Sequence, residues 1–404
     1  MDSEPRLATV RIRELGATLA LGASRAWVNA SDQVALVRAL GVFVLTRLAV
    51  FLVAACAHRL SPAPVSPPIE LYLGKSALGA WIRWDAGWYL NVAERGYWFD
   101  TVGQSNVAFF PLFPLLIRTV GRAIGNPMVA GLLIANLAAV GAAIALWTWV
   151  RDEAGEVTAG RAVLWLAVFP FSFFLQTIYA ESLFFLLVTL ALIAGRRGHW
   201  PAAGLLGGLA AATRPMGVLL FPAFAWTLVR EWHRGTRTVR LGDALGLLLV
   251  PAGLGLYMAF LWAAFGDPLA FWYAHATGWN VRFHWDLAGY WREATWLLTR
   301  GPRIRTYTQL MDTLRVVLPV CFIALTVGAF RRLGATAGIY TAGTVAVAIL
   351  FAPESVGREL LAAVPAFAVM GFSSRGIVDE GLRLASFAAL LVLLIAFVTA
   401  HFVG

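Results

Sequence analysis

The stretch 127–150, PMVAGLLIANLAAVGAAIALWTWV, decides the class of fold. It runs for 24 residues without a single Asp, Glu, Lys or Arg. A helix needs about 20 apolar residues to cross the hydrocarbon core of a bilayer. A charged side chain near the centre of that core costs roughly 3 kcal/mol or more. The stretch therefore predicts a membrane-spanning helix.

Further apolar windows lie on both sides of this stretch. The whole chain is 60% hydrophobic and 13% charged, with a mean hydropathy of +0.73, whereas about a quarter of a soluble domain is charged. These values exclude a soluble globular protein and a disordered chain. We predict an all-α polytopic membrane protein with about eleven transmembrane helices, in a range of about nine to thirteen. The predicted spans are 36–57, 127–150, 161–178, 181–195, 200–213, 215–230, 242–265, 314–330, 335–352, 359–373 and 383–403.

The positions of the arginines predict the orientation, because cytoplasmic loops carry an excess of Lys and Arg. When the N-terminus is placed inside, the short positive loops all fall on the same side. Residues 1–35 then form a cytoplasmic, amphipathic N-terminal segment. The inner loops are 151–161, 196–199, 230–240, 331–332 and 375–383.

Two large loops, 58–126 and 267–313, fall on the outer side in this arrangement. The first contains the apolar segment 107–122, whose Pro111 and Pro114 would break the interior of a helix. We therefore place this segment in or on the membrane and not across it. No repeat of 20–50 residues is visible, so residues 1–404 are expected to form one membrane domain.

The net charge of +10 and the pI near 10.3 come almost entirely from arginine. In a membrane protein this excess indicates contact with anionic lipid and not with nucleic acid. Cys56 and Cys321 lie in apolar runs, and no metal-binding or nucleotide-binding motif occurs, so neither a metal nor a cofactor is predicted. Lys75 is the only lysine, and this Ala-, Gly- and Arg-rich composition suggests a bacterial plasma membrane.

Asp85 is the most informative residue of the first outer loop. It lies in the heptapeptide RWDAGWY (83–89), beside the aromatic residues Trp84, Trp88 and Tyr89. A carboxylate held among aromatic rings is suited to general-base catalysis, and indole rings also suit stacking on a sugar. The structural alternative is an aromatic belt at the membrane interface, with Asp85 paired to Arg83 or to another arginine.

Other ionisable residues reach the outer face in the same topology. Arg214 precedes Pro215 and is expected at a helix break, where it could bind a lipid phosphate or extend to the interface. Glu181 could belong to a site or could be an acid favoured at a helix N-terminus. Arg47, within the first span, should face a polar partner or cavity. The remaining candidates on the outer face are His275, Trp279 and Arg358.

Several blocks of sequence occur in an order that resembles a known family. They are RWDAGWY (83–89), AERGY (93–97), AFFPLFPL (108–115), PFSFF (170–174), YAESLF (179–184), TRPMG (213–217), GDP (266–268) and SVGRELL (355–361). Over about residues 40–370 the chain resembles the PIG-V-like mannosyltransferases, which belong to the GT-C class of integral membrane glycosyltransferases. His275 and Glu359 depart from the pattern, which has glutamine and tyrosine at these places.

The resemblance implies a GT-C-like fold and transfer of a sugar, most often mannose, from a polyprenyl-phosphate donor. Transfer would occur on the outer face, with inversion, to a lipid-linked or glycan acceptor, with membrane lipids as further partners. The resemblance also implies that Asp85 is the base, and no metal or cofactor is expected. The side chains expected to bind the donor phosphate or the substrates are Arg214, Arg358, Glu181, Arg83, Trp84, Trp88, Tyr89, His275 and Trp279.

Two alternatives to an enzyme remain open at this point. A transporter or flippase of a lipid-linked substrate should show inverted repeats, and no such symmetry is visible. A non-catalytic membrane scaffold would not depend on Asp85. The sequence does not identify the acceptor or the oligomeric state.

Overall fold

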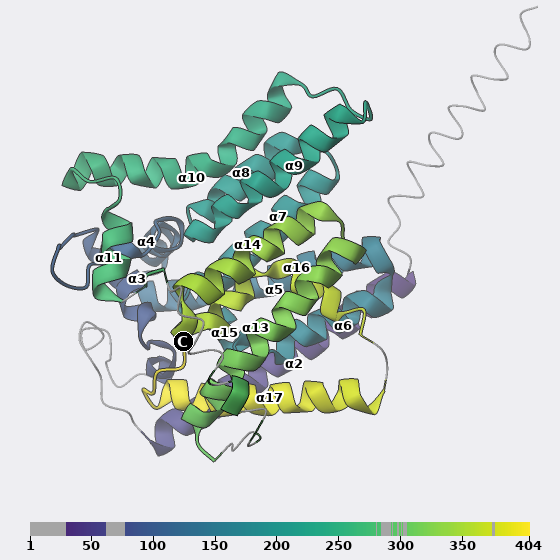
Figure 1. Ribbon diagram of the computed structural model, residues 1–404. Helices are drawn as coiled ribbons and strands as arrows, with labels where there is room; N and C mark the ends of the chain where they lie inside the picture. The colour runs from purple at the N-terminus through teal and green to yellow at the C-terminus, as the bar shows by residue number, and fades with distance from the viewer. Residues whose placement is uncertain are drawn as a thin grey trace, which may run out of the picture.

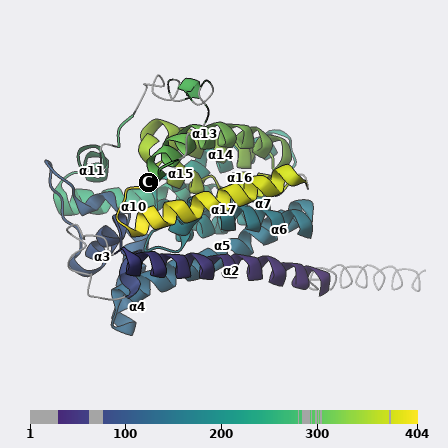
Figure 2. The same cartoon turned by 90° about the horizontal axis from the view of Figure 1, so that it is seen from below.

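The computed structural model describes residues 30–61, 77–279, 281–283, 305–373 and 376–404, and a few single positions between 292 and 301. These residues form α-helices and short 3-10 helices, with no β-strand among them. Most of the long helices lie side by side along one direction, as two perpendicular views show (Figures 1 and 2). The predicted all-α architecture is confirmed.

Each predicted span overlaps a described helix, but the helices differ in length. Those long and apolar enough to cross a membrane are α2 (Ala30–Leu60), α5 (Pro127–Ala154), α10 (Leu241–Phe265), α13 (Tyr307–Arg332) and α17 (Ile377–Val398). A bent pair, α14 (Ala335–Phe351) with the segment Pro353–Ala362, turns by 116° and could add a sixth. Shorter helices are α6 (Glu156–Val168), α7 (Glu181–Arg196), α8 (Trp200–Ala211), α9 (Leu220–His233) and α16 (Val364–Met370). The count of eleven spans therefore stays a prediction.

Arg47 explains how one of the short helices ends inside the bundle. After α6 stops at Val168, the chain continues through the 3-10 helix η4 (Ser172–Leu175). Carbonyl groups freed at such a break need donors, because an unpaired buried carbonyl is costly. The Arg47 guanidinium donates to the carbonyl oxygen of Ser172 at 2.7 Å and to that of Ala167. Arg47 thus has polar partners, as expected: these two backbone carbonyl groups and the hydroxyl of Ser172 at 3.1 Å.

Glycines allow α8 and α10 to pack with their backbones almost in contact. A Cβ added to Gly204 would lie 1.6 Å from the carbonyl oxygen of Gly246, and one added to Gly253 would lie 1.9 Å from that of Gly208. Only residues without a side chain fit at such crossings. The glycines of α8 therefore allow close helix packing through small residues.

The loop segments gather at one end of the helical bundle, called here the site end. They include α3 (Asp85–Arg95), α4 (Leu112–Ile124) and α11 (Ala270–Gly278), which lie together in both views (Figures 1 and 2). With 13 residues, α4 is too short to cross a bilayer. Pro111 and Pro114 lie at its start and do not break its interior, which differs from the prediction. The Gln104 side chain donates to the carbonyl oxygen of Gly278 at 3.2 Å, so the two predicted outer loops contact each other.

Some predictions fall outside the described residues. Of the predicted amphipathic N-terminus 1–35, positions 1–29 are not described, and α2 begins at Ala30. The same holds for 62–76 in the first loop and for most of 284–304 in the second. The orientation of the chain in the membrane stays a prediction.

Candidate active site

The turn before α3 places Asp85 at the first position of that helix. The preceding Trp84 has a φ of 52°, a left-handed backbone conformation that is unusual for a bulky residue. The Tyr179 hydroxyl holds this turn, because it accepts from the backbone N–H of Asp85 at 3.1 Å and donates to the carbonyl oxygen of Arg83 at 3.2 Å. The carboxylate therefore lies at a helix N-terminus, where negative charge is favoured.

Five charged side chains from four parts of the chain meet at the site end and form what we call the charge cluster: Asp85, Glu181, Arg214, Arg358 and Glu359. One guanidinium nitrogen of Arg358 lies 2.5 Å from Oδ2 of Asp85. Arg214 lies 2.8 Å from Oε1 of Glu181 and donates to both carboxylate oxygens of Glu359 at 2.6 and 2.7 Å. Arg358 also lies 3.7 Å from both glutamates.

Each member of the charge cluster stands where a helix begins or is interrupted. Glu181 is the first residue of α7, and Arg214 has an extended backbone immediately before Pro215. Arg358 and Glu359 belong to the four-residue helix α15 (Val356–Glu359) in the bent pair. The break predicted at Arg214 is therefore present. Its side chain is buried between two carboxylates, which does not fit extension to the interface.

The charge cluster is more open on one side than on the other. The side chains of Asp85 and Arg358 are 20% and 14% exposed, whereas that of Glu181 is 4% exposed. Oε2 of Glu181 and Nε of Arg358 are buried and have no hydrogen-bond partner among the described residues. A polar ligand could therefore approach along the Asp85–Arg358 pair and find unused hydrogen-bonding groups behind it.

Aromatic rings adjoin the charge cluster and form what we call the aromatic wall: Trp88, Tyr89, Phe109 and Trp279. The ring of Trp88 stacks on that of Phe109 at 5.9 Å and 9°, and Trp279 meets both rings edge-on at 5.4 Å. Tyr89 contacts Phe109 edge-on at 5.0 Å. Because Trp88 and Tyr89 follow Asp85 by three and four residues on α3, the helix presents acid and rings on one side.

Two titratable groups near the charge cluster stay neutral at physiological pH. Burial, and secondly the negative charge of Glu181, raises the pKa of Tyr89 well above its usual range. Burial lowers the pKa of His275 to about 4, although Glu359 and Asp85 oppose this shift. Both side chains can then exchange hydrogen bonds without adding charge to a site that already holds five charged groups.

The structure brings most of the predicted site residues together. Asp85, Glu181, Arg214 and Arg358 form contacts, and the rings of Trp88, Tyr89 and Trp279 adjoin them, with His275 6.3 Å from Trp279 between ring centres.

Two predicted residues point elsewhere. Arg83 donates to the carbonyl oxygen of Val398 at 3.1 Å and lies beside His58. Trp84 packs edge-on against Phe402 at 5.6 Å. The structural alternative for Asp85, a pairing with an arginine, does occur, and the partner is Arg358 and not Arg83.

Three residues of the site are absent from the sequence prediction. Glu359 accepts hydrogen bonds from Arg214 with both carboxylate oxygens, Tyr179 fixes the turn at Asp85, and Phe109 completes the aromatic wall. The departure from the family pattern at Glu359 was an available signal, because an acid next to an arginine at membrane depth needs a partner. Among the described residues no three His, Cys, Asp or Glu side chains are arranged to hold a metal ion.

Comparison with known proteins gives a family match for just under half of the chain. Residues 34–233 match the model of the family Mannosyltransferase (PIG-V). GPI alpha-1,6-mannosyltransferase 2 of Rattus norvegicus is 33% identical over 180 residues, which cover 40% of this chain and 35% of that protein. The Mus musculus protein of the same name is 32% identical over 180 residues, covering 41% and 34%. The chain thus matches about a third of the length of these relatives.

The fold also has a counterpart among solved structures. The crystal structure of ArnT from Cupriavidus metallidurans bound to undecaprenyl phosphate aligns over 89% of this chain and 63% of ArnT, with a TM-score of 0.53 and 18% identity. At this identity the likeness concerns the fold alone. The match over residues 34–233, together with the rat and mouse relatives, confirms the resemblance of this chain to the PIG-V mannosyltransferase family.

Proposed function

We propose that this protein is a membrane glycosyltransferase that moves a sugar, mannose, from a polyprenyl-phosphate donor to a lipid-linked or glycan acceptor on the outer face. The observation that carries the proposal is the Asp85–Arg358 ion pair of 2.5 Å at the open side of the charge cluster. It puts a base for the acceptor hydroxyl next to a cation for the donor phosphate. Both groups are required by an inverting displacement, in which one bond forms as the other breaks.

Each residue has a defined part in the reaction. Asp85 takes the proton of the acceptor hydroxyl as its oxygen attacks the anomeric carbon of the donor. The bond from that carbon to the phosphate oxygen breaks on the opposite face, so that the configuration inverts. Negative charge develops on the departing phosphate, and Arg358 and Arg214 stabilise it. No metal or cofactor takes part in this scheme.

Charge balance sets the order of events. The two guanidinium groups of the charge cluster face three carboxylates, so neither cation is without an anionic partner. A donor phosphate that binds the exposed side of Arg358 must compete with the Asp85 carboxylate for the guanidinium nitrogen that Asp85 holds. Donor binding then releases Asp85 to act as a base, and we infer that the donor binds before the acceptor reacts. The greater exposure of Asp85 and Arg358 supports exchange at this pair and not at Glu181.

The aromatic wall supports a sugar as the transferred group. Stacked and edge-on rings beside a carboxylate present flat apolar faces for the C–H side of a sugar ring. The Asp85 carboxylate can then contact the hydroxyl groups of this sugar.

The proposed location in a bacterial plasma membrane rests on the amino-acid composition alone, because the matched relatives come from rat and mouse.

Transfer of labelled sugar tests the proposal. Membranes carrying the full-length wild type, Asp85→Asn or Asp312→Asn are incubated with radiolabelled polyprenyl-phosphate mannose and a lipid extract. We expect Asp85→Asn to lower transfer about 10²–10⁴-fold, which is the usual contribution of a general base. The exposed Asp312, which pairs with Arg315 one turn away, is the matched control and should transfer as the wild type does.

Two results would reject the proposal. Equal transfer by Asp85→Asn and wild type would show that Asp85 is not the general base. Movement of the labelled lipid across the membrane without any transfer would favour the flippase alternative.

A further inference from the structure

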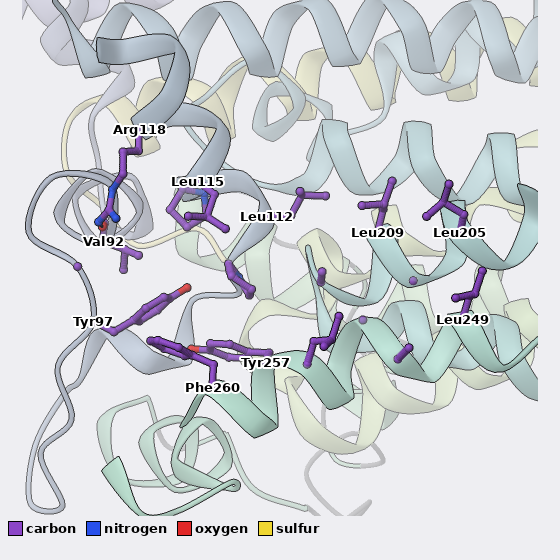
Figure 3. Close-up of a pocket in the computed structure, with 18 residues that line it drawn as sticks. Val92, Tyr97, Leu112, Leu115, Arg118, Leu205, Leu209, Leu249, Tyr257 and Phe260 are labelled. Atoms are coloured by element: carbon purple, nitrogen blue, oxygen red, sulfur yellow. The ribbon is translucent and has the colours of Figure 1, made fainter. Parts of the chain in front are cut away.

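An apolar groove of about 560 Å³ lies at the site end, between α3 and α4 on one side and α8 and α10 on the other. Figure 3 shows leucines of α4, α8 and α10, including Leu112, Leu209 and Leu249, pointing into it. Its volume is in the usual range of ligand-binding sites. No acidic residue lines it, and Arg118 is the only charged residue among the lining residues.

The shape of the groove follows from the glycine packing of α8 and α10. Gly208 and Gly253 line it, and a Cβ on either would meet backbone of the opposite helix at 2.4 or 1.9 Å. Because these positions carry no side chains, α8 and α10 cross closely here, and leucines of both helices line the groove. Such a channel fits a hydrocarbon chain better than it fits a compact polar molecule.

Arg118 stands near one end of the groove, close to Tyr97 (Figure 3). Its Nε donates to the carbonyl oxygen of Ala93 at 2.7 Å, and a terminal nitrogen donates to that of Val92 at 2.9 Å. These bonds leave other N–H groups of the guanidinium, and no carboxylate in the described part of the chain pairs with it. A cation beside an apolar groove in a membrane protein calls for an anion, and a lipid phosphate supplies one.

We propose that this groove binds the hydrocarbon chain of the lipid-linked acceptor, with the acceptor's phosphate at Arg118. The inference rests on the proposed function, which assigns the donor phosphate to Arg358 and Arg214. A second cation with its own apolar channel then serves a second anionic lipid, and in a transfer reaction that lipid is the acceptor.

Helix α3 fixes the distance between the two sites. Asp85 is its first residue, and Arg118 binds the carbonyl groups of Val92 and Ala93 near its other end. Eight residues at 1.5 Å each separate Asp85 from Ala93 by about 12 Å along the axis. The acceptor hydroxyl must reach Asp85 while the phosphate stays at Arg118. We therefore infer an acceptor head that extends from the phosphate toward Asp85, as a glycan attached to the lipid does.

Binding of two probe lipids to the full-length protein in detergent tests the assignment. The probes are radiolabelled phosphatidylinositol, for an anionic lipid with acyl chains, and undecaprenyl phosphate, for the donor carrier. Two variants change the groove. Arg118→Gln removes the cation, and Leu256→Trp fills the channel from α10 without touching the bonds of Arg118.

Two matched controls change nearby surfaces that do not line the groove. Arg122→Gln is exposed one turn further along α4, and Leu248→Trp is an exposed leucine on α10.

We expect both groove variants to weaken phosphatidylinositol binding about tenfold, as loss of a charge-assisted hydrogen bond or of the channel would. The groove variants should bind undecaprenyl phosphate with an affinity within about twofold of wild type. The control variants should bind both lipids within the same range. Loss of undecaprenyl phosphate binding in Leu256→Trp would show that the groove holds the donor and would overturn the proposal. Unchanged phosphatidylinositol binding in Leu256→Trp would also overturn it. Because binding needs no sugar transfer, a wild type without transferase activity would reject the proposed function and leave this result interpretable.

Discussion

Arginine side chains lie at two places in this protein where helices are interrupted, and they have different kinds of partner. At the break after α6, Arg47 donates to the backbone carbonyl groups of Ala167 and Ser172. In the charge cluster, Arg214 and Arg358 bind side-chain carboxylates contributed by distant helices. Backbone carbonyls at a break cannot leave without unfolding it. A carboxylate can turn away when another anion arrives, so only the second arrangement can exchange partners with a substrate.

The comparison separates a structural arginine from a functional one. Loss of Arg47 should damage the fold and spare the chemistry of molecules that remain folded. Loss of Arg358 should damage the chemistry first, because Arg214 still pairs with Glu181 and Glu359 in its absence.

The largest effect is expected for Arg358→Ala. Removal of a group that stabilises charge in the transition state commonly costs about 10²–10³-fold in rate. Arg358→Lys keeps the positive charge but loses the forked geometry, so it should fold normally and transfer at an intermediate rate. Initial rates of mannose transfer in vesicles measure both, with Arg315→Ala at the same end of the bundle as the control. A wild-type rate of transfer in Arg358→Ala would show that Arg358 does not stabilise the donor phosphate.

A second effect concerns stability. Arg47→Ala removes the guanidinium that donates to the buried carbonyl oxygens of Ala167 and Ser172, of which Ala167 keeps the Ser172 hydroxyl as a donor, and it should cost roughly 3 kcal/mol. The midpoint of thermal unfolding in detergent should fall, whereas Arg38→Ala, exposed on the same helix, should leave it unchanged. Transfer per folded molecule should stay within about twofold of wild type. A stable Arg47→Ala protein without activity would show that Arg47 takes part in the reaction and does not have a purely structural role.

The smallest effect is expected for His275→Gln. Because burial lowers the pKa of His275 from 6.5 to about 4, its imidazole is neutral from pH 5 to 8, as a glutamine side chain is. Any stability that this lowered pKa contributes is complete above pH 6.5 and is lost as the pH falls toward 4. The pH–rate profiles of wild type and His275→Gln should therefore coincide between pH 5 and 8. An acid limb near pH 6.5 that disappears in the variant would show that His275 titrates during catalysis.

Local sequence features predicted the fold and the members of the site to a large extent. Charge-free windows located the helices, and Pro215 placed Arg214 at a break. Asp85 and the rings of Trp88 and Tyr89 share one helix, so helical spacing alone put them on one side. These are properties of near neighbours in the chain.

The partners of these residues could not be predicted in the same way. Asp85 and Arg358 are 273 positions apart, and only the packed bundle brings them together. Arg83, two residues before Asp85, instead turns toward Val398 in α17 because the strained turn at Trp84 separates the two side chains. The groove beside Arg118 depends on the closeness of α8 and α10, which no single segment specifies.

The affinity of Asp85→Asn for undecaprenyl phosphate tests the exchange of partners at Arg358 most directly. In wild type the Asp85 carboxylate competes with phosphate for the Arg358 guanidinium, and asparagine removes this competitor without changing the shape. We predict that the variant, although inactive in transfer, binds undecaprenyl phosphate about threefold or more tightly than wild type. Weaker or equal binding by Asp85→Asn would contradict the account, because Asp85 and the phosphate would then not share Arg358.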